Sequence, residues 1–180
     1  DQILNFHRDN LGISRFKKIE YFSKEILCED FNEAIFKAKL IKFADILEKK
    51  IFNCKYIPGV IAFIDKISLK NELFISSGTP ENELVKICKS RKIDNYFNNI
   101  YGSPETKDIH LKKIMLNNNY LCEDLLFIGD SISDYQVSKN FDINFLAIGS
   151  EIKKYTNDNI YLKKNFINYK DIIKEFSLII

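Results

Sequence analysis

The sequence predicts an α/β fold, in which helices cover both faces of a parallel sheet and an all-helical segment is attached. The first observation is that short apolar runs alternate with helical stretches from residue 57 onward. The second is that glycines stand at the ends of four apolar runs, where parallel strands commonly turn toward a ligand. The third is that residues 1–56 hold no proline and a single glycine.

Each element follows from its local pattern. The first 56 residues are expected to form about three helices, because apolar residues recur at helical spacing in FKKIEYFSKEIL and FNEAIFKAKLIKFADILEKKIF. The break at Ile57-Pro58-Gly59 divides the chain into a helical domain of residues 1–56 and an α/β domain of residues 57–180. The second domain is expected to contain helices at 59–69, 80–91, 106–117, 133–140 and near 168–177, and strands at 72–77, 98–102, 125–129 and 144–149.

The composition excludes several classes of protein. A chain of 180 residues, 46% hydrophobic, can bury a core. The net charge of +2 and the scattered lysines give no reason to expect a nucleic-acid partner. The four cysteines form no C-x-x-C pair, which argues against a zinc or redox site and fits a cytoplasmic protein. No apolar run approaches the roughly 20 residues of a membrane span, so we expect no membrane partner. The oligomeric state is unknown from the sequence.

The most specific motif is FIGDSISDYQ at 127–136. An apolar strand stops there at Gly129 and delivers Asp130, and then Asp134, into a turn that opens a helix. Two carboxylates at such a turn can point toward the same space at the end of the strand. That arrangement suits Mg²⁺ that keeps several bound waters. The alternative is an aspartate that caps the helix, with a second one favoured by the helix dipole. The motif alone leaves both interpretations open.

A second polar motif, FISSGTP at 74–80, ends another apolar strand. Pro80 is expected to be the first residue of a helix, with Thr79 as its N-cap. The hydroxyl of Ser77, the amide of Gly78 and the positive end of that helix would then form a pocket suited to phosphate. Ordinary turn and capping chemistry is the simpler explanation of this motif taken alone.

A third polar motif, YGSPETKD at 101–108, places Lys107 in a turn directly after a predicted strand. A cation at this position can offset charge on a phosphoryl group during transfer. A lone lysine is ordinarily a solvated surface residue, so this assignment depends on Ser77 and Asp130 converging beside it. His110, in the following helix, is expected to be structural or exposed rather than catalytic.

In this order, Ser77, Lys107 and the turn from Asp130 to Asp134 resemble the second, third and fourth motifs of the haloacid dehalogenase-like hydrolase superfamily. The subgroup they resemble contains phosphoglycolate phosphatase and β-phosphoglucomutase, which carry a helical cap. The resemblance covers essentially the whole chain. It implies a Rossmann-like three-layer core from Pro58 onward and identifies the first 56 residues as the cap, inserted after the first core strand.

The sequence departs from the family at its first motif. That motif, Asp-x-Asp followed by Gly or Thr on the first core strand, has no counterpart here. In the family its first aspartate is the nucleophile and its second exchanges protons with the leaving group and water. The strand lies in the middle of the family's sheet. Its absence should therefore expose apolar side chains of the sheet and leave backbone N–H and C=O groups of the neighbouring strands without partners. We expect about 20 to 40 further upstream residues in the natural protein and expect the 180 residues alone to be inactive.

The resemblance implies an Mg²⁺-dependent phosphatase that acts on a small phosphorylated metabolite through an aspartyl-phosphate. Asp130 would hold the metal, Asp134 would support it, Ser77 and Gly78 would bind phosphoryl oxygens, and Lys107 would neutralise developing charge. The alternatives are a phosphomutase of the same superfamily and a non-catalytic protein that keeps the pocket for binding or regulation.

The cap segment HRDNLGISRFKK at 7–18 supplies candidate substrate contacts. Two of the chain's three arginines lie there, at a break between predicted helices. An arginine in such a loop can bind an anionic substrate, or it can pair with cap carboxylates and helix C-termini. The candidates are Arg15, the first choice, with Arg8, His7 and Asn10.

Overall fold

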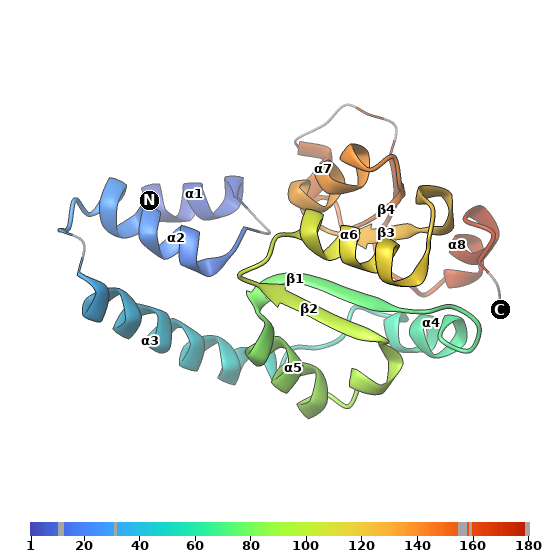
Figure 1. Cartoon of the computed structure of the whole chain (residues 1–180), viewed down its shortest axis with the longest axis horizontal. Coiled ribbons are helices and arrows are strands. Elements are labelled where there is room, and N and C mark those ends of the chain that lie inside the picture. The colour runs from blue at the N-terminus through green and yellow to red at the C-terminus, as the bar shows by residue number, and fades with distance from the viewer. Residues whose placement is uncertain (11–12, 31, 155–157, 159, 179–180) are drawn as a thin grey trace.

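The computed structural model describes residues 1–10, 13–30, 32–154, 158 and 160–178 (Figure 1). It confirms the α/β fold class: a run of helices at the start of the chain is followed by parallel strands that alternate with helices. Figure 1 shows the first three helices as an arm beside the strand-containing part.

The helical arm consists of α1 (Gln2–Asp9), α2 (Arg15–Tyr21) and α3 (Glu33–Ile51), with a π-helical turn η1 (Phe22–Ile26) continuing α2. Aromatic packing joins α1 to α2, because the ring of Phe6 stacks on Tyr21 with centroids 3.8 Å apart. The hydroxyl of Ser14, the N-cap of α2, accepts a hydrogen bond from the Lys17 amide at 3.5 Å. None of the helices in the described ranges has the length and apolar character needed to cross a membrane.

Every strand and helix expected after residue 57 is present, with boundaries that differ by a few residues. In chain order the elements are α4 (Val60–Ile67), β1 (Phe74–Pro80), α5 (Glu81–Ser90), η2 (Asp94–Tyr96), β2 (Asn99–Ser103), α6 (Lys107–Asn118), η3 (Cys122–Asp124), β3 (Leu126–Gly129), α7 (Ile132–Asn140), β4 (Asn144–Ile148), η4 (Glu151–Lys154), β5 (Tyr161–Lys163) and α8 (Tyr169–Glu175). β5 was not predicted from the sequence, because a strand of three residues shows no clear alternation of apolar and polar positions.

The strands form two separate parallel sheets instead of the single sheet that the alternation predicts. β1 pairs with β2, with Phe74 opposite Asn99, and β4 lies between β3 and β5, with Leu126 of β3 opposite Asn144. No strand in the described part of the chain bridges β1 and β3. β1 and β3 therefore each keep one edge without a strand partner in the described part of the chain.

The helices cover the sheets and bury two apolar clusters. Figure 1 shows α5 and α6 on opposite sides of β1 and β2. Phe63 of α4, Leu146 of β4 and Ile172 of α8 are almost fully buried in the larger cluster, where the ring of Phe63 stacks on Phe166 at 4.9 Å. Burial of each such side chain contributes about 1.5–3 kcal/mol. The smaller cluster joins α6 to α7 through Leu111, Val137 and Ile143.

The capping prediction at the end of β1 was wrong by one residue. β1 runs through Pro80, so Pro80 is the N-cap and α5 begins at Glu81. Thr79 therefore does not cap the helix. Its amide instead donates a hydrogen bond to the hydroxyl of Ser77 at 3.1 Å, in the part of β1 where the pairing register with β2 shifts.

Candidate active site

The turn from β3 into α7 holds Asp134 rigidly through a capping box. Ser131 is the N-cap of α7, and its hydroxyl accepts a hydrogen bond from the Asp134 amide at 3.3 Å. In return, Asp134 Oδ2 accepts from the Ser131 hydroxyl at 2.6 Å and from the Ser131 amide at 3.1 Å. The turn does cap the helix, as one of the two sequence-based interpretations proposed. The capping residue is Ser131 instead of an aspartate, and Asp134 accepts the reciprocal hydrogen bonds. Asp130 stands just before the helix and takes no part in the box.

Lys107, the first residue of α6, reaches across to α7. Its ammonium group forms an ion pair with Asp134 Oδ1 and donates to the Ser133 hydroxyl at 3.2 Å. The side chains of Lys107 and Asp134 are only 11% and 7% exposed, so little solvent screens their attraction. The structure therefore brings together two of the predicted site residues from separate elements. Ser131 and Ser133, which complete the network, were not singled out from the sequence.

Asp130 lies beside this pair and reaches solvent. Partial desolvation raises the pKa of its carboxyl, and the negative charge of Asp134 raises it further, while its backbone amide and Lys107 act in the opposite direction. Lys107, the cation that acts on Asp130, is already paired with Asp134.

Gly129 allows the close approach of β3 and α7. A Cβ atom placed on Gly129 would lie 2.4 Å from Cβ of Asp134, closer than real side chains approach. Gly102, at the end of β2, is constrained in the same way by the backbone of Glu81, whose Cα would lie 2.4 Å from such an atom. Glycine at these two strand ends thus answers a packing requirement.

Ser77 and Gly78 lie in the carboxyl-terminal part of β1, as predicted. The Ser77 hydroxyl accepts from the Thr79 amide, and among the described residues no hydrogen bond links Ser77 or Gly78 to Lys107. Ser77 and Gly78 belong to the sheet of β1 and β2, whereas Asp130 follows β3 of the other sheet. A bound anion is the kind of group that would engage both, and their role in phosphate binding stays a prediction.

His110 is fully buried one turn after Lys107 and fixes α6 against the strands. Its Nε2 lies 3.1 Å from the carbonyl oxygen of Gly102, so Nε2 carries the hydrogen, and Nδ1 accepts from the Ser76 hydroxyl at 2.8 Å. Desolvation lowers the pKa of His110, despite the favourable Gly102 carbonyl. This neutral imidazole is structural, as expected, and it ties the helix that carries Lys107 to β1 and β2.

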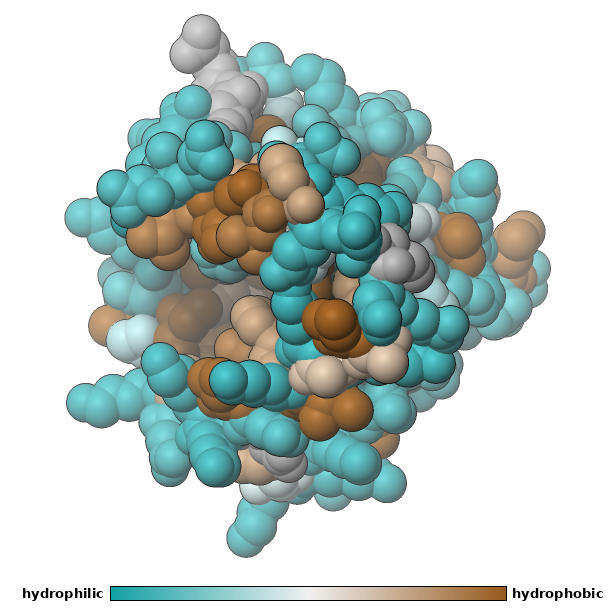
Figure 2. All heavy atoms as spheres, turned by 90° about the vertical axis from the view of Figure 1, so that its left-hand side faces the viewer, coloured by the Kyte–Doolittle hydropathy of each residue, from teal (hydrophilic) through white to brown (hydrophobic). Residues whose placement is uncertain are grey.

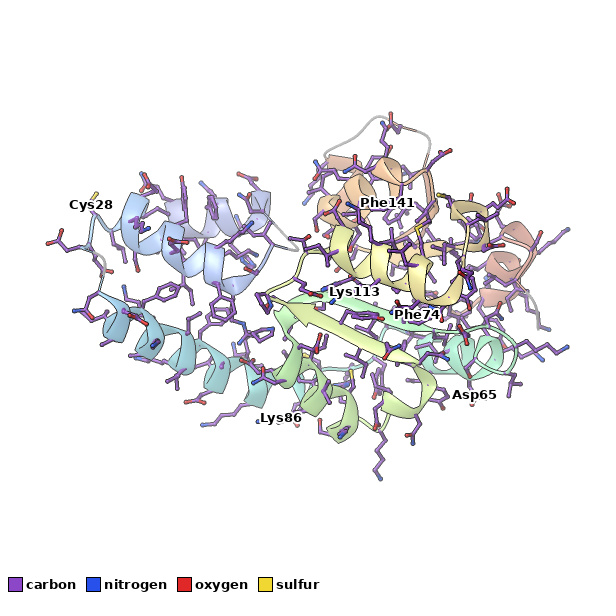
Figure 3. All side chains as sticks on the ribbon, in the orientation of Figure 1. Cys28, Asp65, Phe74, Lys86, Lys113 and Phe141 are labelled. Carbon is purple, nitrogen blue, oxygen red and sulfur yellow. The ribbon has the colours of Figure 1, made fainter. Side chains whose placement is uncertain are left out.

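Arg15, the first-choice candidate for substrate contact, is paired with a carboxylate. Arg15 is buried, lies 5.5 Å above the ring of Phe43, and forms an ion pair with Glu83 of α5 at 2.7 Å. The pairing partner is therefore a carboxylate outside the cap. Figure 3 labels Lys86 on the same helix, and Arg15, Glu83 and Lys86 line a cavity of about 270 Å³ between the arm and α5.

The remaining cap candidates serve local structure. Asn10 donates to the carbonyl oxygen of Phe6 at 2.9 Å at the end of α1. His7 Nδ1 lies 3.3 Å from the ammonium of Lys18, and the pKa of His7 is lowered by desolvation and by the charges of Lys18 and Arg8. Arg8 lies exposed on α1. Substrate contact by any of them stays a prediction.

The donor set is compatible with Mg²⁺, although it is sparse. No cluster of three or more histidine, cysteine, aspartate or glutamate side chains with metal-binding geometry occurs within the described ranges. Both carboxylate oxygens of Asp134 already accept hydrogen bonds, from Lys107 and Ser131. Asp130 is therefore the better placed of the two carboxylates to coordinate a metal ion. Mg²⁺ is commonly held by one or two carboxylates, with waters and substrate phosphate completing the shell. Asp130 could supply such a carboxylate ligand.

Comparison with known sequences decides the family. The sequence pattern of the haloacid dehalogenase-like hydrolases matches residues 5–148, which is most of the chain. The chain belongs to this family. Ser77, Lys107, Asp130 and Asp134 all fall within the matched range, so the family resemblance drawn from those residues is confirmed.

Solved structures of other haloacid dehalogenase-like proteins share the fold. The β-phosphoglucomutase of Clostridium difficile superposes with a TM-score of 0.77 at 15% identity, covering 97% of this chain and 82% of its own. A predicted phosphoglycolate phosphatase from Haemophilus somnus 129PT gives a TM-score of 0.76 at 14% identity, covering 93% and 81%. A family protein from Streptococcus pneumoniae gives a TM-score of 0.66 at 17% identity, covering 89% and 81%.

A curated relative matches over a shorter stretch. A protein of Wolbachia pipientis wMel, described as a pyruvate, phosphate dikinase regulatory protein, is 35% identical over 66 residues. The match covers 36% of this chain and spans about a quarter, 24%, of that relative's length. The match is to a segment of that protein.

Proposed function

We propose that the protein is an Mg²⁺-dependent phosphatase that hydrolyses a small phosphorylated metabolite. The observation that carries the proposal is the buried ion pair of Lys107 with Asp134, beside the solvent-exposed carboxylate of Asp130. A cationic group and an exposed carboxylate close to each other suit a phosphoryl group, whose oxygens carry negative charge during transfer. Membership of the haloacid dehalogenase-like hydrolases supports the hydrolase class.

In the proposed reaction each residue has a separate task. Asp130 would hold Mg²⁺, which would balance negative charge on the phosphoryl oxygens when bound. Asp134 would keep Lys107 extended toward the mouth, and Lys107 would attract the phosphate. Ser77 and the Gly78 amide at the end of β1 would hydrogen-bond phosphoryl oxygens from the other side.

The nucleophile is not among the 180 residues, because no Asp-x-Asp sequence occurs in them. We propose that the first aspartate of the family's first motif, on a strand outside these residues, attacks phosphorus while the bond to the ester oxygen breaks, and that the second aspartate of the motif gives its proton to that oxygen. Water would then cleave the aspartyl-phosphate, regenerate the carboxylate and release inorganic phosphate. The 180 residues alone are therefore expected to bind phosphate esters without turning them over.

The test compares the product of the complete gene with the 180-residue chain. Phosphate release from a panel of small phosphomonoesters should require Mg²⁺ and should occur only with the complete product. Release by the 180-residue chain at the same rate would contradict the proposal that it lacks the nucleophile.

A second candidate is a non-catalytic binding protein, which the lack of Asp-x-Asp favours. It predicts that the complete product binds a phosphorylated metabolite without consuming it. A phosphomutase would instead convert the ester into an isomer with little free phosphate. The resemblance to a β-phosphoglucomutase and to a phosphoglycolate phosphatase is equally close in fold, so product analysis decides between them.

A further inference from the structure

The cavity of about 270 Å³ between the helical arm and α5 is separate from the candidate active site, because Ser77, Lys107, Asp130 and Asp134 do not line it. The C-terminal half of α3 forms one wall, and one face of α5 forms the other (Figure 1). Pockets for drug-sized ligands measure about 300–1,000 Å³. A ligand that fills this cavity is therefore smaller, of the size of a single amino acid.

Two contacts between the arm and α5 mark the ends of the cavity. At one end Arg15 of α2 bonds to Glu83 of α5 at 2.7 Å and lies over the ring of Phe43 of α3. At the other end the guanidinium of Arg91, just after α5, donates to the carbonyl oxygen of Ile51 at 2.7 Å. α3 and α5 therefore run in the same direction along the cavity, from the Arg15 end to the Ile51 end.

The two ends differ in polarity. Asn82 and Glu83, in the first turn of α5, lie at the Arg15 end. Asp45 also lies toward that end, because it follows Phe43 by two residues on α3. The lining toward the other end is apolar and consists of Leu47, Ile51, Phe52 and Ile87. A ligand that matches both ends carries its polar groups on one side and an apolar chain on the other.

Arg15 is the buried cation of the polar end. Its side chain is 7% exposed, and its one hydrogen bond to a described residue runs from Nη1 to Glu83 Oε2. Among the described side chains, the one fully buried polar atom without a hydrogen-bond partner is Ser103 Oγ, so the other nitrogens of Arg15 border accessible space. The planar donors of a guanidinium match the two oxygens of a carboxylate.

Lys86 and Asp45 add two charges to the lining. Lys86 lies one turn after Asn82 on the same face of α5. Neither Lys86 nor Asp45 forms an ion pair with another described residue, whereas Glu83 is occupied by Arg15. The cavity thus offers cationic and amide donors for a carboxylate, and one carboxylate acceptor for an ammonium group.

We propose that this cavity binds an α-amino acid with an aliphatic side chain, such as leucine. The carboxylate of the ligand accepts hydrogen bonds from Arg15 and Lys86, and its ammonium group donates to Asp45. Its side chain packs between Leu47 and Ile87. This binding site does not rest on the proposed phosphatase activity, so the failure of either proposal leaves the other untouched.

The test is isothermal titration of the complete gene product with L-leucine and three compounds that each lack one of its groups. Leucine should bind with a Kd of about 1 mM or tighter. Isoamylamine, which lacks the carboxylate, and glycine, which lacks the side chain, should each bind at least about tenfold more weakly. Isocaproate, which lacks the ammonium group, should bind about threefold more weakly. Equal affinities of the four compounds, or no binding of leucine at about 10 mM, would overturn the proposal.

Variants of exposed residues locate the two charged groups of the ligand. Asp45→Asn should weaken leucine about threefold and leave isocaproate unchanged, whereas Asp30→Asn, at an exposed aspartate of the arm outside the cavity, should alter neither. Lys86→Ala should weaken both compounds about threefold, and Lys89→Ala, on the same helix outside the cavity, should weaken neither. Equal losses of leucine and isocaproate in Asp45→Asn would overturn the assigned ammonium contact.

Competition with inorganic phosphate separates this cavity from the candidate active site. Phosphate at about 10 mM should leave the affinity for leucine unchanged, because Ser77, Lys107 and Asp130 lie outside the cavity. Displacement of leucine by phosphate would assign the amino acid to the candidate active site and would overturn the proposal of a separate binding site.

Discussion

Lys107 and Asp134 form a buried ion pair that joins the first residue of α6 to the first turn of α7. The carboxylate of Asp134 is held from its other side by Ser131. Removal of the lysine would thus leave a fixed, desolvated negative charge beside Asp130, whose own charge is already disfavoured. This pair links the stability of the fold to the electrostatics of the candidate site.

Lys107→Ala should destabilise the protein by about 3 kcal/mol, because breaking a buried pair costs more than the pair itself contributes. Urea unfolding measures the change. Lys112→Ala, an exposed lysine on the same helix, is the matched control and should change stability by less than about 0.5 kcal/mol. Equal small effects of the two substitutions would show that the pair is not formed in solution.

Gly129→Ala should displace Asp134, because the new Cβ would lie 2.4 Å from the Cβ of that residue. We expect a loss of about 2–3 kcal/mol from overpacking. In the Gly129→Ala background, Lys107→Ala should then cost less than it does alone. Gly149→Ala is the control: Gly149 has φ +88° and open space around its Cβ position, so the change should cost about 1–2 kcal/mol and leave the effect of Lys107→Ala intact. Full additivity in both backgrounds would contradict the predicted coupling.

The stability of the protein should fall as the pH is lowered through and below the ordinary pKa of histidine. Burial lowers the pKa of His110 in the folded state, so the unfolded chain binds a proton at a higher pH than the folded one. The contribution of the neutral ring is complete above about pH 6.5 and is lost as the pH falls through the folded-state pKa. Unfolding free energies at pH 7.5 and 5.5 measure this loss.

His110→Gln should reduce this pH dependence, although loss of the bonds to Ser76 and Gly102 lowers stability at both pH values. His7→Gln serves as the control, because His7 is exposed on α1, which has no buried side chain, and should contribute less. A pH dependence that His110→Gln leaves unchanged would assign the effect to carboxylates instead.

The pair of Arg15 with Glu83 connects the helical arm to α5, and a charge exchange tests whether that is its role. Arg15→Ala and Glu83→Ala should each cost about 1–3 kcal/mol, and the double exchange Arg15→Glu with Glu83→Arg should recover part of the loss. Lys17→Ala, an exposed neighbour on α2, should have little effect on stability.

The same variants test the predicted substrate contact of Arg15. If Arg15 binds the substrate, Arg15→Ala raises KM for the true substrate more than for a small generic ester, and the charge exchange does not restore it. If the arginine only ties the arm to α5, restored stability and restored KM go together. Figure 2 shows apolar side chains gathered around a hollow on the arm side of the molecule.

The sequence predicted the elements around the site because their signals are local. The apolar strand that ends at Gly129, and the serine and aspartates that follow it, fix the β3–α7 turn without reference to distant residues. Lys107 could be proposed from its place after β2, and its partner Asp134 was among the candidates.

The rest depends on contacts between residues far apart in the chain. Glu83 binds Arg15 from a helix 68 residues later, and no local pattern marks it as a partner. The burial of His110 between Ser76 and Gly102 likewise follows from the packing of α6 on the strands. The division into two sheets could be expected only through the family resemblance, since the strand periodicities themselves do not reveal which strands are neighbours.

The most direct test of the central claim is phosphate release by the complete gene product and its Asp130→Ala variant, each assayed with Mg²⁺ and with EDTA. The proposed function predicts Mg²⁺-dependent release from small phosphomonoesters that EDTA abolishes and that Asp130→Ala removes. Undiminished, EDTA-resistant turnover in the Asp130→Ala variant would contradict the assignment of Asp130 to a metal-assisted phosphatase site.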